Sequence, residues 1–243
     1  MYMNLFTIFF LMNLKNTYSK KIIQKVFSAK TNGQKLYSRA LYHPNNHLIV
    51  CNGPAGSGKT CMACDYSIQN LHSKKFQKII ITRPTVSIQE DLGYLPGTIN
   101  EKMHPWTLPI FDIFHEYYSK NEIEAMIKDG IIEISPLGFM QGRTFKNAII
   151  IADEMQNSSI GQIFMLMTRL GENSKMIING DLNQNKWNPN YKENGLKDLI
   201  KKLKEKYPTY ELLSENNIEF IELQKEDIVR HPMVSKIISL YND

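Results

Sequence analysis

Residues 53–60 of this 243-residue chain read Gly-Pro-Ala-Gly-Ser-Gly-Lys-Thr and match the pattern G-x-x-x-x-G-K-[ST]. The apolar run 48–51 precedes them as a candidate buried strand, and residues 59–71 have the composition of a helix. Glycines let a backbone curl until several N–H groups face one anion, and the following helix presents its positive end to that anion. A chance match in a flexible loop would not need this order of strand, loop and helix. The run therefore predicts a phosphate-binding loop.

The motif assigns roles within this loop. We expect the Lys59 ammonium to reach the β- and γ-phosphates of a nucleotide and the Thr60 hydroxyl to ligate Mg²⁺. The residues predicted to hold the phosphates are Gly53, Pro54, Ala55, Gly56, Ser57, Gly58, Lys59 and Thr60. The loop thus predicts a site for a nucleoside triphosphate and its magnesium ion.

An acidic pair, Asp153 and Glu154, directly follows the apolar run 149–152. Strand ends in parallel sheets open onto the ligand crevice, so we expect both carboxylates near the phosphate-binding loop. Asp153 would hold Mg²⁺ through its shell, and Glu154 would polarise the attacking water as general base. The alternative is an ordinary loop start, which acidic residues after a strand often mark.

Gln184 follows another strand-like run, 175–179. If that strand ends in the same crevice, the Gln184 amide would sense the γ-phosphate by accepting from water and donating to a phosphate oxygen. The competing interpretation is a turn rich in Asp, Asn and Gly.

Apolar runs of strand type alternate along the chain with amphipathic stretches of helix type. The runs lie at 48–51, 78–82, 131–134, 148–152, 175–179 and 218–223. This alternation predicts an α/β fold with a mainly parallel sheet flanked by helices on both faces. We expect one compact domain over residues 32–243, preceded by an N-terminal extension over residues 1–31.

The extension is apolar over residues 1–12 and basic over residues 15–30. Its apolar part is too short to span a bilayer and lacks the basic stretch and the cleavage site of a signal peptide. We therefore expect no membrane association. The apolar part has two interpretations: a packed terminal helix, or an upstream start codon with translation beginning at Met12. The basic part suits a surface helix or arm.

Composition narrows the class of protein only a little. A formal charge of +5 suits a polyanionic partner, but a biased nucleotide composition of the gene would explain the lysines equally well. The cysteines, Cys51, Cys61 and Cys64, are too few and too clustered for a disulfide framework, which favours a reducing, cytoplasmic location. Cys61 and Cys64 form a C-x-x-C without a second pair, so we expect core residues and no metal there.

Eight short blocks occur in one order along the chain: 53–60, 82–84, 93–97, 142–144, 153–157, 168–171, 180–181 with Gln184, and 229–232. In this order they resemble the PhoH-like ATPase family, over roughly residue 34 to the C-terminus. That family is similar to the nucleotide-binding core of superfamily-one helicases. The resemblance implies a RecA-like P-loop NTPase fold, ATP as substrate, Mg²⁺ as cofactor, and RNA or another single-stranded nucleic acid as partner.

The resemblance also implies roles for residues outside the loop. Gln34 is similar to the helicase glutamine that reads adenine, with a solvent-exposed helix residue as the alternative. Gln156 would relay between the nucleotide and the nucleic acid. Arg143, Arg169 and Arg230 are the candidates for stabilising transition-state charge, and each has a structural salt bridge as its alternative.

Two positions depart from the pattern of many relatives. Met155 stands where alanine is frequent, which should alter only packing. Gln141 replaces a basic residue and so removes a charge near the expected nucleic-acid path. The chain also lacks room for the nuclease domain that some relatives carry ahead of the ATPase, so ribonuclease activity is not expected.

The leading hypothesis is a Mg²⁺-dependent ATPase that couples hydrolysis to binding or remodelling of RNA or another nucleic acid. Translocating helicases need two RecA-like domains around the nucleotide. We therefore expect a homo-oligomer, for example a ring, in which a neighbouring subunit supplies an arginine to the site. The alternatives are a nucleotide-gated switch on nucleic acid with little turnover and a small-molecule phosphotransferase.

Overall fold

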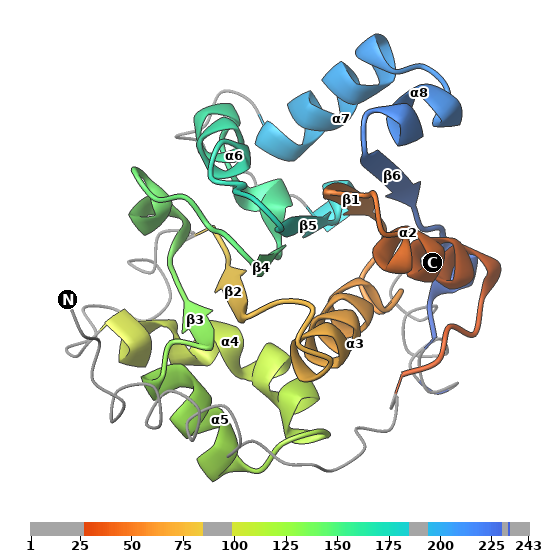
Figure 1. The fold of residues 1–243 in the computed structure, drawn as a ribbon. Coiled ribbons are helices and arrows are strands. Elements are labelled where there is room, and N and C mark those ends of the chain that lie inside the picture. The colour runs from red at the N-terminus through yellow and green to blue at the C-terminus, as the bar shows by residue number, and fades with distance from the viewer. Residues whose placement is uncertain (1–26, 85–98, 185–193, 230–232, 234–243) are drawn as a thin grey trace.

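The computed structural model describes residues 27–84, 99–184, 194–229 and 233, with the backbone alone over 99–106. Six strands form one sheet in the order β3-β2-β4-β5-β1-β6, and every neighbouring pair is parallel (Figure 1). The strands are β1 Leu48–Asn52, β2 Lys78–Thr82, β3 Ile132–Ile134, β4 Ala148–Ala152, β5 Lys175–Gly180 and β6 Ile218–Glu222. The predicted mainly parallel sheet is confirmed.

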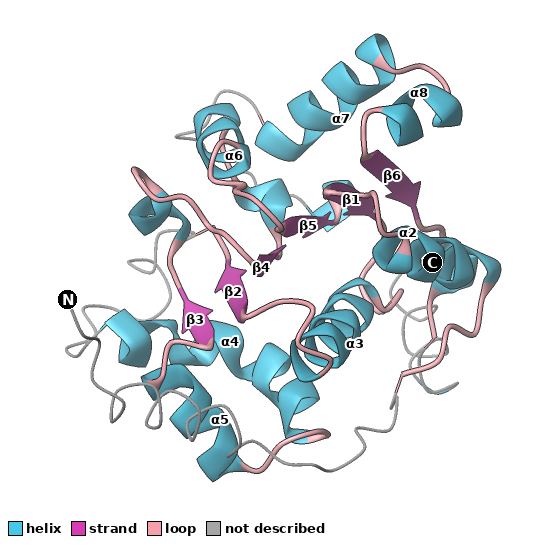
Figure 2. Cartoon of the chain, viewed as in Figure 1, coloured by secondary structure: helices cyan, strands magenta, loops and turns pink. Residues whose placement is uncertain are grey.

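Helices cover both faces of the sheet (Figure 2). One face carries α2 Asn32–Tyr42, α3 Lys59–His72, α4 Ile99–His115 and α5 Lys120–Lys128. The other carries α6 Ile160–Met167 and α7 Gly195–Lys206, while α8 Tyr210–Glu215 lies beside β6. Four turns of 3-10 helix connect these elements: η1 Leu137–Met140, η2 Met155–Asn157, η3 Leu182–Gln184 and η4 Lys225–Asp227.

The strands read as continuous apolar runs because the sheet has a core on each face. Ile149 and Ile151 of β4 pack in the core beneath α2–α5, whereas Ile150, between them, packs in the core beneath α6 and α7. All five residues of β4 are buried. Branched isoleucines suit such a doubly covered strand because they pack well on a pleated surface.

Hydroxyl side chains begin three of the helices with capping boxes. Thr31, Ser119 and Ser159 each accept a hydrogen bond from the backbone three residues on, where a Gln or Glu side chain reaches back to the cap. The Thr31 cap matters most for the site, because the N-terminus of α2 lies close to residues 53–60. The glutamine of this capping box is Gln34.

Strand order brings distant segments to one edge of the sheet. β5 pairs with β1 on one side and with β4 on the other, so the segments after all three strands begin at neighbouring carboxyl ends. The block at 93–97, the apolar part of the extension at 1–12 and most of the block at 229–232 lie outside the described residues. No helix in the described part of the chain is both long and apolar enough to cross a membrane.

Candidate active site at the carboxyl edge of the sheet

The eight motif residues, 53–60, form a tight loop between β1 and α3, here called the phosphate loop. Gly58 caps α3 with φ +90°, a left-handed conformation that L side chains rarely adopt. Gly53 has no room for a side chain, because an added Cβ would lie 2.6 Å from the Cβ of Leu223. The Ala55 N–H donates to a carboxylate oxygen of Asp181, just after β5, at 3.1 Å. Gly58 is thus required by its backbone conformation, and Gly53 by the close approach of Leu223.

Lys59 is buried, and its ammonium folds back over the phosphate loop. It donates to the carbonyl oxygens of Gly53 at 2.6 Å and Pro54 at 2.9 Å. These carbonyls hold the positive charge inside the curve of the loop, at the N-terminus of α3, where the partial positive charge of the helix also favours an anion. The loop and its lysine therefore form a site for a polyanion.

Asp153 lies opposite this helix terminus at the end of β4. The Thr60 hydroxyl donates to its Oδ1 at 3.0 Å, and the Arg83 guanidinium lies 3.5 Å from its Oδ2. Burial raises the pKa of the Asp153 carboxyl, against the opposing effects of Arg83 and Thr60. A hydroxyl and a carboxylate that converge in this way match the oxygen ligands that Mg²⁺ takes in nucleotide sites.

The described residues contain no group of three or more His, Cys, Asp or Glu side chains placed to hold a metal. A magnesium ion bound by Thr60 and Asp153 would therefore take its other ligands from phosphate and water, as Mg²⁺ commonly does. The donor set fits that arrangement.

Glu154 follows Asp153 in a left-handed conformation, with φ +55°, which separates the directions of the two carboxylates. Its Oε1 lies 3.2 Å from the Arg83 guanidinium, and its Oε2 accepts from the Gln156 amide at 2.5 Å. The Gln156 oxygen in turn accepts from the backbone N–H of Asp181 at 3.1 Å. Gln156 thus connects the general-base candidate on β4 with the end of β5.

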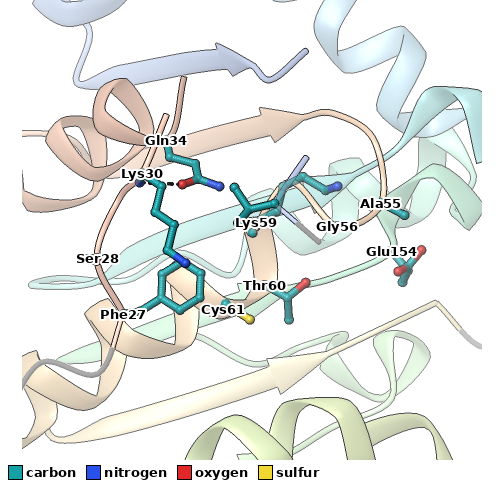
Figure 3. Close-up of a pocket in the computed structure, with 12 residues that line it drawn as sticks. Phe27, Ser28, Lys30, Gln34, Ala55, Gly56, Lys59, Thr60, Cys61 and Glu154 are labelled. Atoms are coloured by element: carbon teal, nitrogen blue, oxygen red, sulfur yellow. Dashed lines mark hydrogen bonds between the residues drawn. The ribbon is translucent and has the colours of Figure 1, made fainter. Parts of the chain in front are cut away.

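A cavity of about 490 Å³ joins these groups to the start of α2. Its size lies within the range of small-molecule sites. Figure 3 shows Phe27, Ser28, Lys30 and Gln34 at one end of the cavity, Ala55, Gly56 and Glu154 at the other, and Lys59, Thr60 and Cys61 between them. We call the first the aromatic end and the second the phosphate end. The predicted loop residues and Glu154 are therefore brought together.

Gln34 is buried at the aromatic end, so the exposed-helix alternative is wrong. Its amide oxygen accepts from the N–H groups of Lys30 at 2.8 Å and Thr31 at 3.4 Å. Its amide nitrogen donates to the carbonyls of Ser57 at 3.0 Å and Asp227 at 3.2 Å. Gln34 therefore lines the cavity predicted for the nucleotide, and its amide bonds to four backbone groups around it.

Three other predicted site residues do not line the cavity. Gln184 is exposed in η3, at the same edge of the sheet, and its backbone N–H donates to the Asp181 carbonyl. Arg143 forms a two-point ion pair with Glu133. Arg169 donates to the carbonyls of Met165 and Arg143, beyond the end of α6. Catalytic roles for these three stay predictions, and Arg230 lies outside the described residues.

Arg83, Asp227 and Phe27 are among the residues of this site that received no role from the sequence. Arg83, in the block 82–84, lies against both carboxylates. Asp227 accepts from the Thr31 hydroxyl and the Gly33 N–H, and so attaches η4 to the start of α2. Phe27, expected on a surface arm, lines the cavity. Only Arg83 had a signal in the sequence, since it follows a predicted strand.

The chain matches one family of known proteins. A family model described as PhoH-like protein matches residues 26–242. A PhoH-like protein of Bacillus subtilis is 40% identical over 221 residues, covering 90% of this chain and 65% of its own length. Protein PhoH of Escherichia coli K12 is 34% identical over 222 residues, covering 88% of this chain and 58% of its own. The chain thus spans about three fifths of such relatives.

Solved structures resemble the chain more distantly. The Sulfolobus solfataricus SWI2/SNF2 ATPase core in complex with dsDNA aligns with a TM-score of 0.47 and 13% identity, over 86% of this chain and 47% of that one. The helicase domain of Pyrococcus furiosus Hef aligns with a TM-score of 0.43 and 12% identity, over 81% of this chain and 38% of that one. At these scores the alignments add nothing to the sequence relationship.

Proposed function

Because the chain belongs to the PhoH-like protein family, we propose that it binds ATP with Mg²⁺ in this cavity and hydrolyses it to ADP and phosphate. The observation that carries the proposal is the meeting of three groups at the phosphate end. The phosphate loop and Glu154 line one cavity, and the Thr60 hydroxyl bonds to Asp153 beside them. A triphosphate seated here has a cation, a helix N-terminus and a carboxylate within its reach.

The side chains divide the chemistry. Lys59 and the loop N–H groups hold the phosphate oxygens, while Thr60 and Asp153 would hold Mg²⁺, which neutralises phosphate charge when bound. Glu154 accepts a proton from a water that attacks the γ-phosphorus, and the bond from that phosphorus to the β–γ bridging oxygen breaks, with ADP leaving. Arg83 offsets the repulsion between the paired carboxylates in the absence of phosphate.

Glu154 also favours hydrolysis over the two alternatives. A phosphotransferase would need an acceptor in place of water, whereas the Gln156 hydrogen bond orients Glu154 at the phosphate end, where a carboxylate can activate water directly. A nucleotide-gated switch with little turnover would not need this general base. Hydrolysis is therefore the function that the geometry supports best.

Coupling to RNA or another single-stranded nucleic acid is the second part of the proposal. It is supported by the resemblance to helicase-like ATPases and by the formal charge of +5. The lysines of α7 add little to it, because Lys201, Lys202 and Lys204 lie in ion pairs with acidic side chains. A homo-oligomer that completes the site from a neighbouring subunit belongs to the same proposal.

We expect the full chain to release phosphate from ATP only with Mg²⁺ present, and faster when single-stranded RNA is added at low salt. The stimulation by RNA should fall between 50 and 200 mM salt, since phosphate contacts release counterions. Phosphate release with and without EDTA and RNA, alongside mass measurement in solution, checks each part. A hydrolysis rate that RNA leaves unchanged would contradict only the coupling to nucleic acid. An absence of Mg²⁺-dependent hydrolysis would contradict the proposed ATPase function.

Cys61 offers a second test, because it lines the cavity and is partly exposed, while Cys51 and Cys64 are buried. Bound ATP should slow alkylation of Cys61 by iodoacetamide about tenfold at ten times its Kd, since only the free protein reacts. Burial, with Asp153 nearby, raises the pKa of the Cys61 thiol, so less thiolate is present at pH 7 and alkylation should accelerate up to pH 9.

Peptide mass mapping measures this alkylation, and Cys61→Ser should abolish it. Nucleotide-free buffer and buffer with added adenosine serve as controls, because neither supplies a triphosphate. An alkylation rate of Cys61 that saturating ATP leaves unchanged would place the nucleotide elsewhere.

A further inference from the structure

The hydrogen-bonding capacity of the Gln34 amide is fully used by protein. An amide side chain has two N–H donors and one oxygen with two lone pairs. Both donors go to the carbonyls of Ser57 and Asp227, and both lone pairs accept from the N–H groups of Lys30 and Thr31. A base could bond to this amide only by displacing one of these four partners, two of which form buried hydrogen bonds with it, and such a displacement costs free energy.

The partners of Gln34 belong to three segments that surround the cavity. Lys30 and Thr31 lie in the segment that enters α2, Ser57 lies in the phosphate loop, and Asp227 lies in η4 beyond β6. The Asp227 carboxylate binds the start of α2 in addition, and the Val229 N–H donates to the Gly56 carbonyl at 3.2 Å. Gln34 is thus the central member of a set of contacts that fixes these segments to one another.

Phe27 supplies an aromatic surface at the opposite end of the cavity from Glu154 (Figure 3). Its ring packs partly against the core and lies at the N-terminus of α3, where an added Cβ on Gly58 would be 3.6 Å from the ring atoms Cε1 and Cζ. A nucleotide whose triphosphate occupies the phosphate loop and points to Glu154 has its base at this end. Ser28 and Lys30 line the cavity beside the ring.

Resting on the ATP binding proposed above, we propose that the purine base stacks on Phe27 beside residues 28–30. In this arrangement Gln34 is a positioning residue that braces the segment against the phosphate loop, and base contacts come from Phe27 and its neighbours. Removing the ring should then weaken binding of anything with a base. Removing the brace should weaken binding of anything with a polyphosphate.

The first experiment measures Kd by calorimetry for ATP and for inorganic tripolyphosphate, both with Mg²⁺, using the full chain. Phe27→Ala should weaken ATP binding by about 5- to 150-fold, the range of base–aromatic stacking, and leave tripolyphosphate binding unchanged. Phe27→Tyr keeps the ring and should restore ATP binding. Equal losses for both ligands, or no loss for either, would overturn the base site.

The second experiment adds GTP and two brace variants, Gln34→Met and Asp227→Asn. Each should weaken ATP, GTP and tripolyphosphate by similar factors and leave the ratio of ATP to GTP affinity as in the parent chain. A changed ratio with intact tripolyphosphate binding in Gln34→Met would mean that Gln34 reads the base directly. Asp227→Asn keeps the test decisive if Gln34→Met fails to fold, since Asp227 bonds the same segment by another route.

The two proposals fail in different ways. If the parent chain binds neither ATP nor tripolyphosphate, the proposed function is wrong. If it binds both and only the variant pattern differs from the expected one, ATP binding stands and the assignment of Phe27 and Gln34 is wrong.

Discussion

Replacing Glu154 by Gln is expected to lower phosphate release from ATP by about 10²- to 10⁴-fold, the usual contribution of a general base. The amide has the same size as the carboxylate and can still contact Arg83 or Gln156. It is neutral, however, and cannot take a proton from water. ATP affinity should change little, because the phosphate loop and Lys59 hold the triphosphate. Single-turnover hydrolysis and equilibrium binding, measured on the same sample, separate the two effects.

Glu172→Gln is the matched control, because Glu172 is an exposed carboxylate paired only weakly with Lys146 at 3.4 Å. It should keep the parent rate. A Glu154→Gln variant that binds ATP and still hydrolyses it at the parent rate would remove Glu154 as the base and leave another group in that role. A variant that also loses ATP binding would assign Glu154 to the binding site instead of to the chemistry.

The parts of this site that sequence alone predicted are those held within one strand-and-turn unit. The phosphate loop follows β1 and the acidic pair follows β4 directly, so periodicity and motif spacing locate Lys59, Thr60, Asp153 and Glu154. The parallel sheet followed from continuous apolar runs that alternate with helices. Because parallel strands end at one edge, the meeting of Thr60 with Asp153 was predictable as well.

The remaining parts depend on contacts between residues far apart in sequence. Gln34 and Asp227 are separated by 193 positions, and no local pattern indicates that they meet. Phe27 lies in a stretch whose basic composition favoured a surface arm, but packing brings its ring to the cavity. Arg143 had a structural salt bridge as its alternative, and its guanidinium does pair with Glu133, while its role in catalysis stays a prediction.

Replacing Lys59 by Ala is expected to produce the other large effect, a loss of about 10²- to 10³-fold in ATP turnover, the cost of removing one preorganised donor to developing charge. Unlike Glu154→Gln, it should weaken ATP and tripolyphosphate binding too, because the ammonium interacts with phosphate in the ground state as well. The titrations used for the parent chain give the Kd values of the variant. Its turnover rate is measured at saturating ATP, where saturation can be reached.

The fold should survive this change, since the ammonium bonds only to the carbonyls of Gly53 and Pro54, within the loop itself. Lys120→Ala, which removes an 80% exposed lysine on α5, is the matched control and should alter neither binding nor turnover. The two variants then test the same site independently. Lys59→Ala should weaken nucleotide binding, whereas Glu154→Gln should slow hydrolysis without weakening binding. If Lys59→Ala binds and turns over ATP like the parent, the nucleotide does not sit in the phosphate loop, and the cavity between Phe27 and Glu154 must serve another ligand.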